Sequence, residues 1–366
     1  MQDRPAASPF PKASPEKAGF DPAALQAAVD YAMKYETPWP RDLRQHIGSG
    51  HFEPPPYNEP IGPIRERGGP AGVILRHGKE VAAWGDPERR DQTFSIAKSY
   101  LSTCVGLAWD RGMIPDLDAP VRDLVDDGGF EPPHNAKITW RMLLQQTSEW
   151  EGTLWEKPDW LDRNRDLATE GADKFKKPPR TLEEPGTYWE YNDVRVNRLA
   201  LAAMRVWRRP LPEVLGEYVM GPMGSSGTWE WRGYRNSTVE IDGRAMESVS
   251  GGSHWGGGMF IGSRDHALLG QLMLNRGQWN GQRIISEEWL DQAVTPCSLN
   301  PVYGFMWWLN TNQASYPSAP ASSVLAMGAG SNVIWIDREH DLVAVVRWIE
   351  KARVDGFFKA VLQAVR

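Results

Sequence analysis

Both ends of the chain carry one amphipathic helix and two neighbouring strands, and this arrangement limits the folds that are available. Near the N-terminus, Asp21 precedes a helix with one apolar face, and residues 72–85 read as a hairpin that turns at a glycine. Near the C-terminus, strands over 332–337 and 342–349 precede a helix with an apolar stripe over 354–365. We therefore predict an α+β fold, with one antiparallel sheet flanked by terminal helices.

The middle of the chain has a different pattern. From about residue 110 to 250 it shows helical stretches and long loops with little sign of strands, and 138–152 and 194–207 are the clearest helices. Another helix is predicted over 95–111, ended by a glycine. The predicted parts are a discontinuous sheet domain, residues 1–108 and 255–366, and a mainly helical insert domain, residues 109–254.

The bulk composition argues against several classes of protein. The 366 residues include 24% charged and 41% hydrophobic residues, which are ordinary values for a globular protein. A net charge of -6 argues against nucleic acid or an anionic membrane as a partner, and no apolar run approaches the ~18 residues that cross a bilayer. If Met1 is the natural start, the lack of an apolar signal core predicts a cytoplasmic protein; a trimmed export signal is the alternative. The sequence does not indicate an oligomeric state.

One short motif, Ser95-Ile-Ala-Lys98, has the residues for nucleophilic chemistry. Ser95 stands where a predicted helix begins, so its N–H has no partner within the helix and the helix dipole favours developing negative charge. Lys98 follows one turn later on the same face, within reach of the serine Oγ. A lysine can serve as the base because burial lowers its pKa. The alternative is a capping serine beside a solvated lysine, and the second match, Ser14-Pro-Glu-Lys17, is interpreted as a turn.

Other catalytic patterns are missing from the sequence. There is no G-x-S-x-G elbow for an α/β-hydrolase, and no P-loop or dinucleotide fingerprint, so no cofactor is predicted. Seven scattered histidines and two cysteines, Cys104 and Cys297, predict neither a metal site nor a disulfide framework. Some tryptophans beside polar motifs are expected to line a pocket; these are Trp150, Trp155, Trp189, Trp255, Trp307 and Trp308.

Together with motifs further along, Phe94-Ser-Ile-Ala-Lys98 resembles the Ser-x-x-Lys motif of the serine β-lactamase, penicillin-binding-protein and esterase superfamily. The chain is most similar to the class C β-lactamase-like branch, which includes esterases and aminohexanoate-oligomer hydrolases. The stretch from Pro185 to Asp193 resembles that branch's Pro-Gly-x-x-x-x-Tyr-x-Asn segment, and Met327-Gly-Ala-Gly-Ser-Asn332 falls where Lys/His-Thr-Gly is expected. Further similar stretches are 138–152, 256–274 and 279–290.

The resemblance implies a β-lactamase/transpeptidase-like fold with the active site in the cleft between the sheet domain and the insert. It implies a serine hydrolase in which Ser95 forms an acyl-enzyme with a small ester or amide substrate. Lys98 and Tyr191 would be general base and acid, and the N–H groups of Ser95 and Ser331 would form the oxyanion hole. The alternatives are a D-alanyl peptidase or β-lactamase, and a non-catalytic binding protein on the same fold.

Two positions depart from the family pattern. Asp193 replaces the Asn of the Tyr-x-Asn motif, so that an amide contact to Lys98 or substrate becomes a charge contact that keeps Lys98 protonated. Gly328-Ala329-Gly330 lacks the cation and hydroxyl that penicillin-recognising members use, so ester or amide hydrolysis is favoured, with Arg347 as a candidate replacement cation. The remaining candidates for substrate contact, beside a glycine-rich turn, are His254 and Trp255.

Overall fold

The centre of the molecule is a six-stranded sheet. The computed structural model describes residues 8–167, 178 and 180–366. The strands are β1 (Ala71–Arg76), β2 (Lys79–Trp84), β11 (Trp308–Leu309), β12 (Val324–Gly328), β13 (Asn332–Asp337) and β14 (Leu342–Arg347). Their order is β11-β12-β13-β14-β1-β2, and every neighbouring pair is antiparallel. The two ends of the chain therefore meet inside the sheet, where β1 pairs with β14 and Val73 lies opposite Val345.

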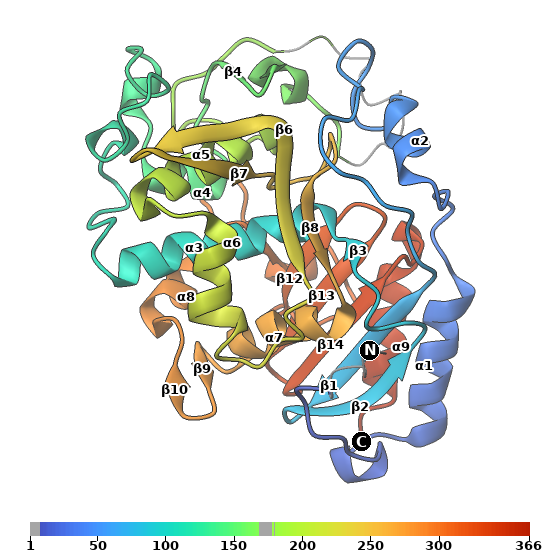
Figure 1. Ribbon diagram of the computed structural model, residues 1–366. Helices are drawn as coiled ribbons and strands as arrows, with labels where there is room; N and C mark the ends of the chain where they lie inside the picture. Colours follow the sequence, from blue (N-terminus) through green and yellow to red (C-terminus); the bar gives the residue numbers. More distant parts are fainter. Residues whose placement is uncertain (1–7, 168–177, 179) are drawn as a thin grey trace, which may run out of the picture.

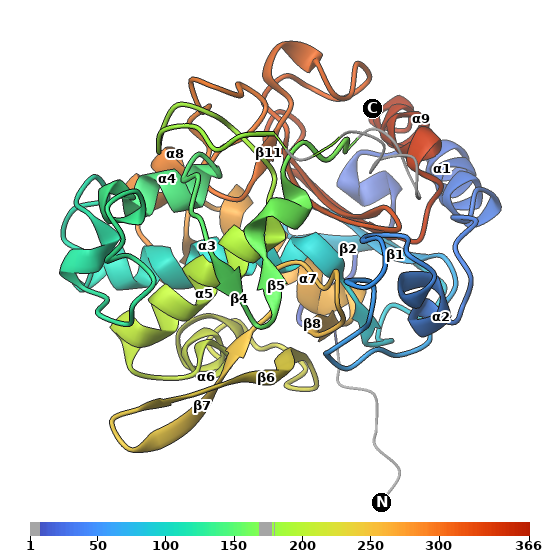
Figure 2. The ribbon, with the colours of Figure 1, turned by 90° about the horizontal axis from the view of Figure 1, so that it is seen from above.

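Helices cover both faces of this sheet (Figure 1). Helices α1 (Pro22–Lys34) and α9 (Val354–Gln363), blue and red in Figures 1 and 2, lie side by side and pack on a face that includes Ile74. Helix α7 (Ser263–Leu274) packs on the other face, which includes Val73. Because successive strand residues point to opposite faces, a sheet covered on both sides needs continuously apolar strands. The predicted antiparallel sheet flanked by terminal helices is confirmed.

Helix α3 (Ala97–Asp110) runs through the middle of the molecule (Figure 1), and the Ser-x-x-Lys motif spans its N-terminal boundary. A 3-10 turn, Phe94–Ile96, leads into it, and the helix is buried on all sides from its first residue to Ala108. A Cβ on Gly106 would lie 2.4 Å from a ring nitrogen of Trp289, so the absence of a side chain lets these elements pack closely. The predicted helix is therefore present, with a tighter first turn than expected.

The remaining elements of the described residues are mostly short. The helices are α2 (Leu43–Gly48), α4 (Trp140–Gln145), α5 (Asp193–Trp207), α6 (Leu211–Leu215), a π-helical turn (Gly216–Met220) and α8 (Glu287–Ala293). The small strand pairs are β4 (Thr153–Leu154) with β5 (Lys157–Pro158) and β9 (Gln278–Trp279) with β10 (Gln282–Arg283). The 3-10 turns not yet mentioned are Glu16–Ala18, Val121–Asp123, Asn135–Lys137, Asp159–Asp162, Thr311–Gln313 and Lys351–Arg353. None of the helices in the described ranges has the length and apolarity needed to cross a bilayer.

The prediction of little strand between residues 110 and 250 was wrong. A long hairpin, β6 (Glu230–Ile241) and β7 (Arg244–Val249), joins β3 (Asp91–Gln92) and β8 (Gly258–Ile261) in a second sheet of order β3-β8-β6-β7. The hairpin projects from one side of the body in Figure 2. This sheet crosses the predicted domain boundary at residue 254. Residues 1–7, 168–177 and 179 of the predicted domains lie outside the described residues.

The helix predicted over 138–152 is also shorter than expected. Helix α4 ends at Gln145, because Gln146 adopts a left-handed conformation with φ of 59°. The Gln146 side chain accepts a hydrogen bond from the Asn192 backbone N–H and donates one to Tyr303 Oη. The first of these bonds connects the end of α4 to the segment that leads into α5. The early end of α4 therefore helps to position the residues around the start of α5.

Candidate active site

Ser95 lies in the turn that leads into α3 and lines a cavity. Its Oγ accepts a hydrogen bond from Lys98 Nζ at 2.8 Å. The preceding residue, Phe94, has φ of 50°, a left-handed conformation that is strained for a residue with a bulky side chain. The Phe94 ring is fully buried and packs edge-on against Trp39 and at a tilt against Phe52. This packing holds the strained turn that presents Ser95 to the cavity.

Lys98 is enclosed between the nucleophile candidate and a carboxylate. It is 1% exposed, and its Nζ forms an ion pair with Asp193 Oδ1 as well as the hydrogen bond to Ser95. The ammonium also lies 4.7 Å from the ring centroid of Tyr191. Burial lowers the pKa of Lys98 below its ordinary value, although the negative charge of Asp193 opposes this shift. Lys98 can therefore accept a proton from Ser95 more readily than a solvated lysine could.

Tyr191 completes the immediate surroundings of Ser95. It lines the cavity, and its ring stacks on Trp308 with centroids 5.5 Å apart. Burial raises the pKa of Tyr191 well above its ordinary value, assisted by the negative charge of Asp193 and opposed by a hydrogen bond with Ser95. The phenol therefore keeps its proton at neutral pH, and it is suited to donate that proton rather than to act as the first base.

Asp193 is the first residue of α5, is 1% exposed and bridges two basic side chains. One carboxylate oxygen pairs with Lys98, and the other lies 2.5 Å from His254 Nε2. Burial favours the neutral acid, but the contacts with His254 and Lys98 outweigh it and hold the pKa of Asp193 well below its ordinary value. The residue that replaces the family's asparagine is thus an anion directly behind the Ser95–Lys98 pair.

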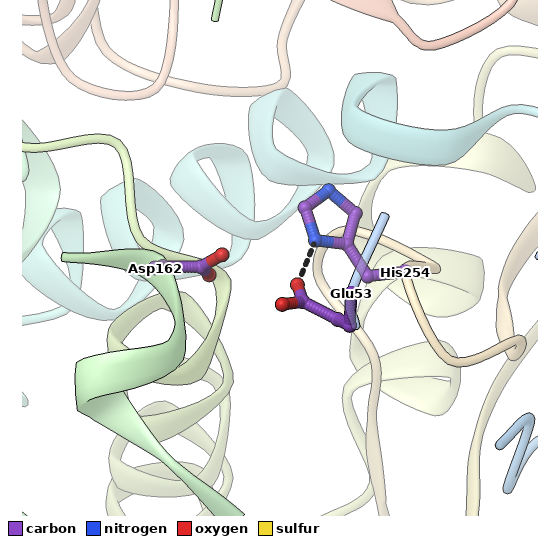
Figure 3. Close-up of side chains that lie close together, drawn as sticks. All are labelled: Glu53, Asp162 and His254. Carbon is purple, nitrogen blue, oxygen red and sulfur yellow. Dashed lines mark ion pairs between the residues drawn. The ribbon is translucent and has the colours of Figure 1, made fainter. Parts of the chain in front are cut away.

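Three further charged residues with buried side chains, Glu53, Asp162 and Arg165, surround His254 and were not found by the sequence analysis; Figure 3 draws Glu53 and Asp162 beside the imidazole. Arg165 Nη1 lies 2.6 Å from Asp162 Oδ1 and 2.9 Å from His254 Nδ1. Glu53 Oε1 lies 3.5 Å from His254 Nδ1, the contact marked by the dashed line in Figure 3, which is an ion pair only when the imidazole is protonated. Glu53 and His254 come from segments far from the Asp162/Arg165 pair, and none of the four belongs to a motif, so no sequence pattern connects them.

Glu53, Asp162 and His254 also have the side-chain types of a metal site. One ligand atom from each lies within 4.8 Å of the other two. However, the Arg165 guanidinium contacts all three residues. Its Nη1 lies 3.8 Å from Glu53 Oε1, 2.6 Å from Asp162 Oδ1 and 2.9 Å from His254 Nδ1. A second cation in the same cluster would be repelled by this permanent charge. The donor set therefore fits an arginine-centred ion-pair network rather than a metal.

The cavity beside Ser95 has a volume of about 300 Å³ and a largely apolar wall. Aromatic and aliphatic side chains supply much of the lining, and the polar side chains that line it include Ser95, Arg165 and the predicted substrate contact His254. The apolar lining residues are Trp39, Phe52, Leu167, Trp308, Leu309, Leu325 and Met327. An acyl or alkyl group of moderate size fits such a wall better than a charged group does.

The segment predicted to occupy the Lys/His-Thr-Gly position lines the cavity and lies where strand β12 ends. Gly328 is the last residue of strand β12, and a Cβ there would lie 2.1 Å from the Thr93 carbonyl oxygen. Strand β12 is therefore pressed against the turn that holds Ser95. Ala329, Gly330 and Ser331 belong to the turn before β13 rather than to the strand, and Ser331 has φ of 55°. All four residues line the cavity.

Two expectations about individual residues are corrected. Trp255 is fully buried, and its ring N–H donates a hydrogen bond to the Tyr57 carbonyl, so it packs in the core rather than contacting substrate. Arg347 is 1% exposed and donates hydrogen bonds to Asn332 and to two backbone carbonyls, so it is not available as a substrate anchor. Burial lowers the pKa of Arg347 to about 10. Of the tryptophans expected near a pocket, Trp308 lines the cavity.

The fold is similar to those of solved hydrolases and penicillin-binding proteins. The chain is 21% identical to the 6-aminohexanoate-dimer hydrolase of Paenarthrobacter ureafaciens over 306 residues, which is 75% of this chain and 71% of the relative. The fold is similar to that of EstCE1, a hydrolase with promiscuous acyltransferase activity, with a TM-score of 0.58 and 15% identity, covering 94% of this chain and 98% of the other. A D-stereospecific amidohydrolase from Streptomyces gives a TM-score of 0.55 and 18% identity over the same shares of the chains. Residues 61–351, well over half of the chain, match the Beta-lactamase family model, and the protein therefore belongs to the Beta-lactamase family.

Proposed function

We propose that the protein is a serine hydrolase that cleaves an ester or amide bond through a Ser95 acyl-enzyme. The observation that carries the proposal is the hydrogen bond of 2.8 Å between Ser95 Oγ and a buried Lys98 at the wall of an apolar cavity. A serine is a weak nucleophile until a neighbouring base accepts its proton, and this pair meets that requirement. Relatives named as a dimer hydrolase and an amidohydrolase support the same class of reaction.

In the first half-reaction, Ser95 Oγ attacks the substrate carbonyl carbon while Lys98 Nζ accepts the serine proton. The N–H groups of Ser95 and Ser331 are proposed to donate hydrogen bonds to the developing oxyanion. Tyr191 donates its proton to the leaving alcohol or amine as the carbonyl–heteroatom bond breaks, and Lys98 returns a proton to Tyr191. In the second half-reaction, water attacks the acyl-enzyme, and the carboxylic acid and free Ser95 are released. These side chains complete the steps without a cofactor.

Asp193 is expected to set the pH at which this base works. The ion pair with the carboxylate stabilises protonated Lys98, and only neutral Lys98 accepts the serine proton, so kcat/KM should rise with pH through an alkaline limb. In Asp193→Asn the charge is removed, the pKa of Lys98 falls, and the limb should move to lower pH by about one unit. The measurement is a pH–rate profile on one aryl ester, with thermal unfolding to show that the variant is folded. A limb that stays in place would mean that the carboxylate does not control the base.

Short-chain aryl esters should be cleaved faster than penicillins or cephalosporins, with kcat/KM higher by ~10²-fold or more. The Gly328–Gly330 segment offers neither cation nor hydroxyl to a β-lactam carboxylate, and a carboxylate bound without a partner costs several kcal/mol. The measurement compares nitrocefin with p-nitrophenyl esters. Lys351 lies exposed at the rim of the cavity and is the cation to test. Nitrocefin turnover that equals the best ester and falls in Lys351→Ala would overturn this prediction.

A hydrolysis screen tests the proposed function as a whole. It should cover esters of increasing acyl length, short amide oligomers, D-alanyl peptides and nitrocefin, each measured with the wild type and with Ser95→Ala. Ester or amide turnover that depends on Ser95 supports the proposal. Preference for the peptides or nitrocefin would instead indicate a D-alanyl peptidase or β-lactamase. Binding without any turnover, and without labelling by a fluorophosphonate, would indicate a binding protein.

A further inference from the structure

His254 occupies the far side of Asp193 from Lys98, at the back of the site. It is 5% exposed, and its ring stacks on Phe52 with centroids 4.5 Å apart and an interplanar angle of 8°. Its Nε2 lies 2.5 Å from Asp193 Oδ2, while Lys98 pairs with Oδ1 of the same carboxylate. A continuous line of polar contacts therefore runs from Ser95 through Lys98 and Asp193 to His254.

The partner on the other ring nitrogen settles how His254 is protonated. Arg165 Nη1 lies 2.9 Å from His254 Nδ1, and a guanidinium can only donate a hydrogen bond. Nδ1 must therefore be the acceptor, and the ring proton must lie on Nε2, where it is donated to Asp193. Glu53 Oε1 is farther from Nδ1, at 3.5 Å, and would suit a protonated ring instead. Burial lowers the pKa of His254, which agrees with a neutral ring at neutral pH.

A closed ring of ion pairs and hydrogen bonds holds the Asp193 carboxylate in place. Arg165 pairs with Asp162 Oδ1 at 2.6 Å, and Asp162 Oδ2 accepts the backbone N–H of Asp193 at 2.7 Å. His254 closes the ring by joining Arg165 to Asp193 Oδ2. Asp193 is thus fixed at both its backbone and its side chain, and the free direction of the carboxylate points to Lys98.

We propose that His254 is a positioning residue that acts through Asp193, sharing the carboxylate with Lys98 and so weakening its hold on the lysine proton. This inference rests on the proposed function, because it assigns His254 a part in activating Ser95. A hydrogen bond from Nε2 to Oδ2 spreads the negative charge of Asp193 over two donors. With that donor removed, the full charge of the carboxylate would act on Lys98 and keep it protonated to higher pH.

Several charged groups face His254 from the elements packed around it. The acidic groups are Glu53, Asp162 and Asp193, and the basic groups are Arg165 and, across Asp193, Lys98. Tyr191 shares the cluster through the backbone hydrogen bond that its carbonyl accepts from Arg165 at 3.4 Å. The charge of Asp162 is already paired with Arg165. Loss of the hydrogen-bond donor at His254 therefore changes the surroundings of the Asp193 carboxylate first.

Two amide substitutions separate the two sides of the imidazole. In His254→Gln the side-chain amide can reach the position of Nε2 and still donate to Asp193, whereas in His254→Asn the shorter amide reaches only the position of Nδ1 and faces Arg165. The readout is the pH dependence of fluorophosphonate labelling of Ser95, which needs no knowledge of the substrate. We expect the labelling limb of His254→Asn to move to higher pH by about one unit and that of His254→Gln to stay near the wild type. His77→Gln, at the exposed β1–β2 turn, is the matched control and should not shift.

The Asp193→Asn background tests whether the effect passes through the carboxylate. There, adding His254→Asn should cause no further shift. If His254→Asn does not fold, His254→Phe, which can keep the stacking on Phe52, replaces it. A folded variant with an unmoved limb, or an equal shift without the carboxylate, would overturn the inference. Failure of the proposed function looks different, because Ser95 would then not be labelled in the wild type.

Discussion

Replacing Ser95 with alanine is expected to lower ester turnover by at least ~10⁴-fold, because the acyl-enzyme can no longer form. The substitution removes one hydroxyl whose partner, Lys98, keeps its ion pair with Asp193, so little stability should be lost. The measurement is kcat/KM on the best ester of the screen, together with the thermal unfolding midpoint. Residual activity near the wild-type value would show that another residue is the nucleophile.

The chain provides a matched control for this experiment in its second Ser-x-x-Lys sequence. Ser14 precedes a 3-10 turn at Glu16–Ala18, and its carbonyl accepts the backbone N–H of Ala18. The serine at this position serves local backbone structure, and neither it nor Lys17 lines the cavity. Ser14→Ala should therefore keep full turnover, and a large loss in this variant would contradict the assignment of the two motifs.

Removing the phenol oxygen in Tyr191→Phe is expected to lower kcat by roughly 10²- to 10⁴-fold, the scale of a lost general acid–base contribution. The ring can keep its stacking on Trp308 and its contact with the Lys98 ammonium, so the unfolding midpoint should change little. Steady-state kinetics on an ester with a poor leaving group is the most sensitive measurement, because protonation of the leaving group matters most there.

A neighbouring tyrosine provides the control for Tyr191→Phe. Tyr303 is also buried, with its ring centroid 6.1 Å from that of Tyr191, and its hydroxyl accepts a hydrogen bond from Gln146 at 3.0 Å. Tyr303→Phe should cost about 1 kcal/mol of folding free energy from the lost hydrogen bond, with a much smaller effect on kcat. Equal losses of kcat in both variants would remove Tyr191 from the proton-transfer steps.

Local sequence signals predicted the outer frame of the fold well. Asp21 accepts the N–H of Ala24 and starts α1 as expected, and the hairpin around Gly78 and the strands 332–337 and 342–347 are present. These elements depend on capping, turn chemistry and apolar patterning, which act over a few residues. The pairing of the N-terminal and C-terminal strands could also be predicted, because the apolar residues of both hairpins had to be buried in one sheet.

The β6–β7 hairpin was missed although it carries a recognisable signal. Asp242 and Gly243 both have positive φ, at 55° and 75°, as the tight turn of a hairpin requires, and Asp-Gly is a strong sequence indicator of that turn. The polar residues along Glu230–Ile241 obscured the strand pattern because much of this hairpin is only partly buried. Alternation of burial along the strand, rather than overall apolarity, was the relevant feature.

The residues of the candidate site likewise include some that the sequence predicted and some that it did not. Ser95, Lys98 and Tyr191 lie within recognisable motifs, and the structure brings their side chains together. Glu53 and Arg165 could not be found from the sequence, because their relation to Asp193 is created by the packing of separate loops around one buried charge. Buried ion pairs of this kind satisfy one another in three dimensions and leave no spacing rule along the chain.

Mapping the covalent adduct tests the central claim most directly. The protein is treated with a fluorophosphonate, or with an ester whose acyl-enzyme is trapped by rapid acid quenching, and the modified peptide is identified by mass spectrometry. We predict a single adduct on the peptide that contains Ser95, absent from Ser95→Ala and unaffected by Ser14→Ala. An adduct on any other residue, or ester turnover by the wild type with no adduct on Ser95, would contradict the assignment.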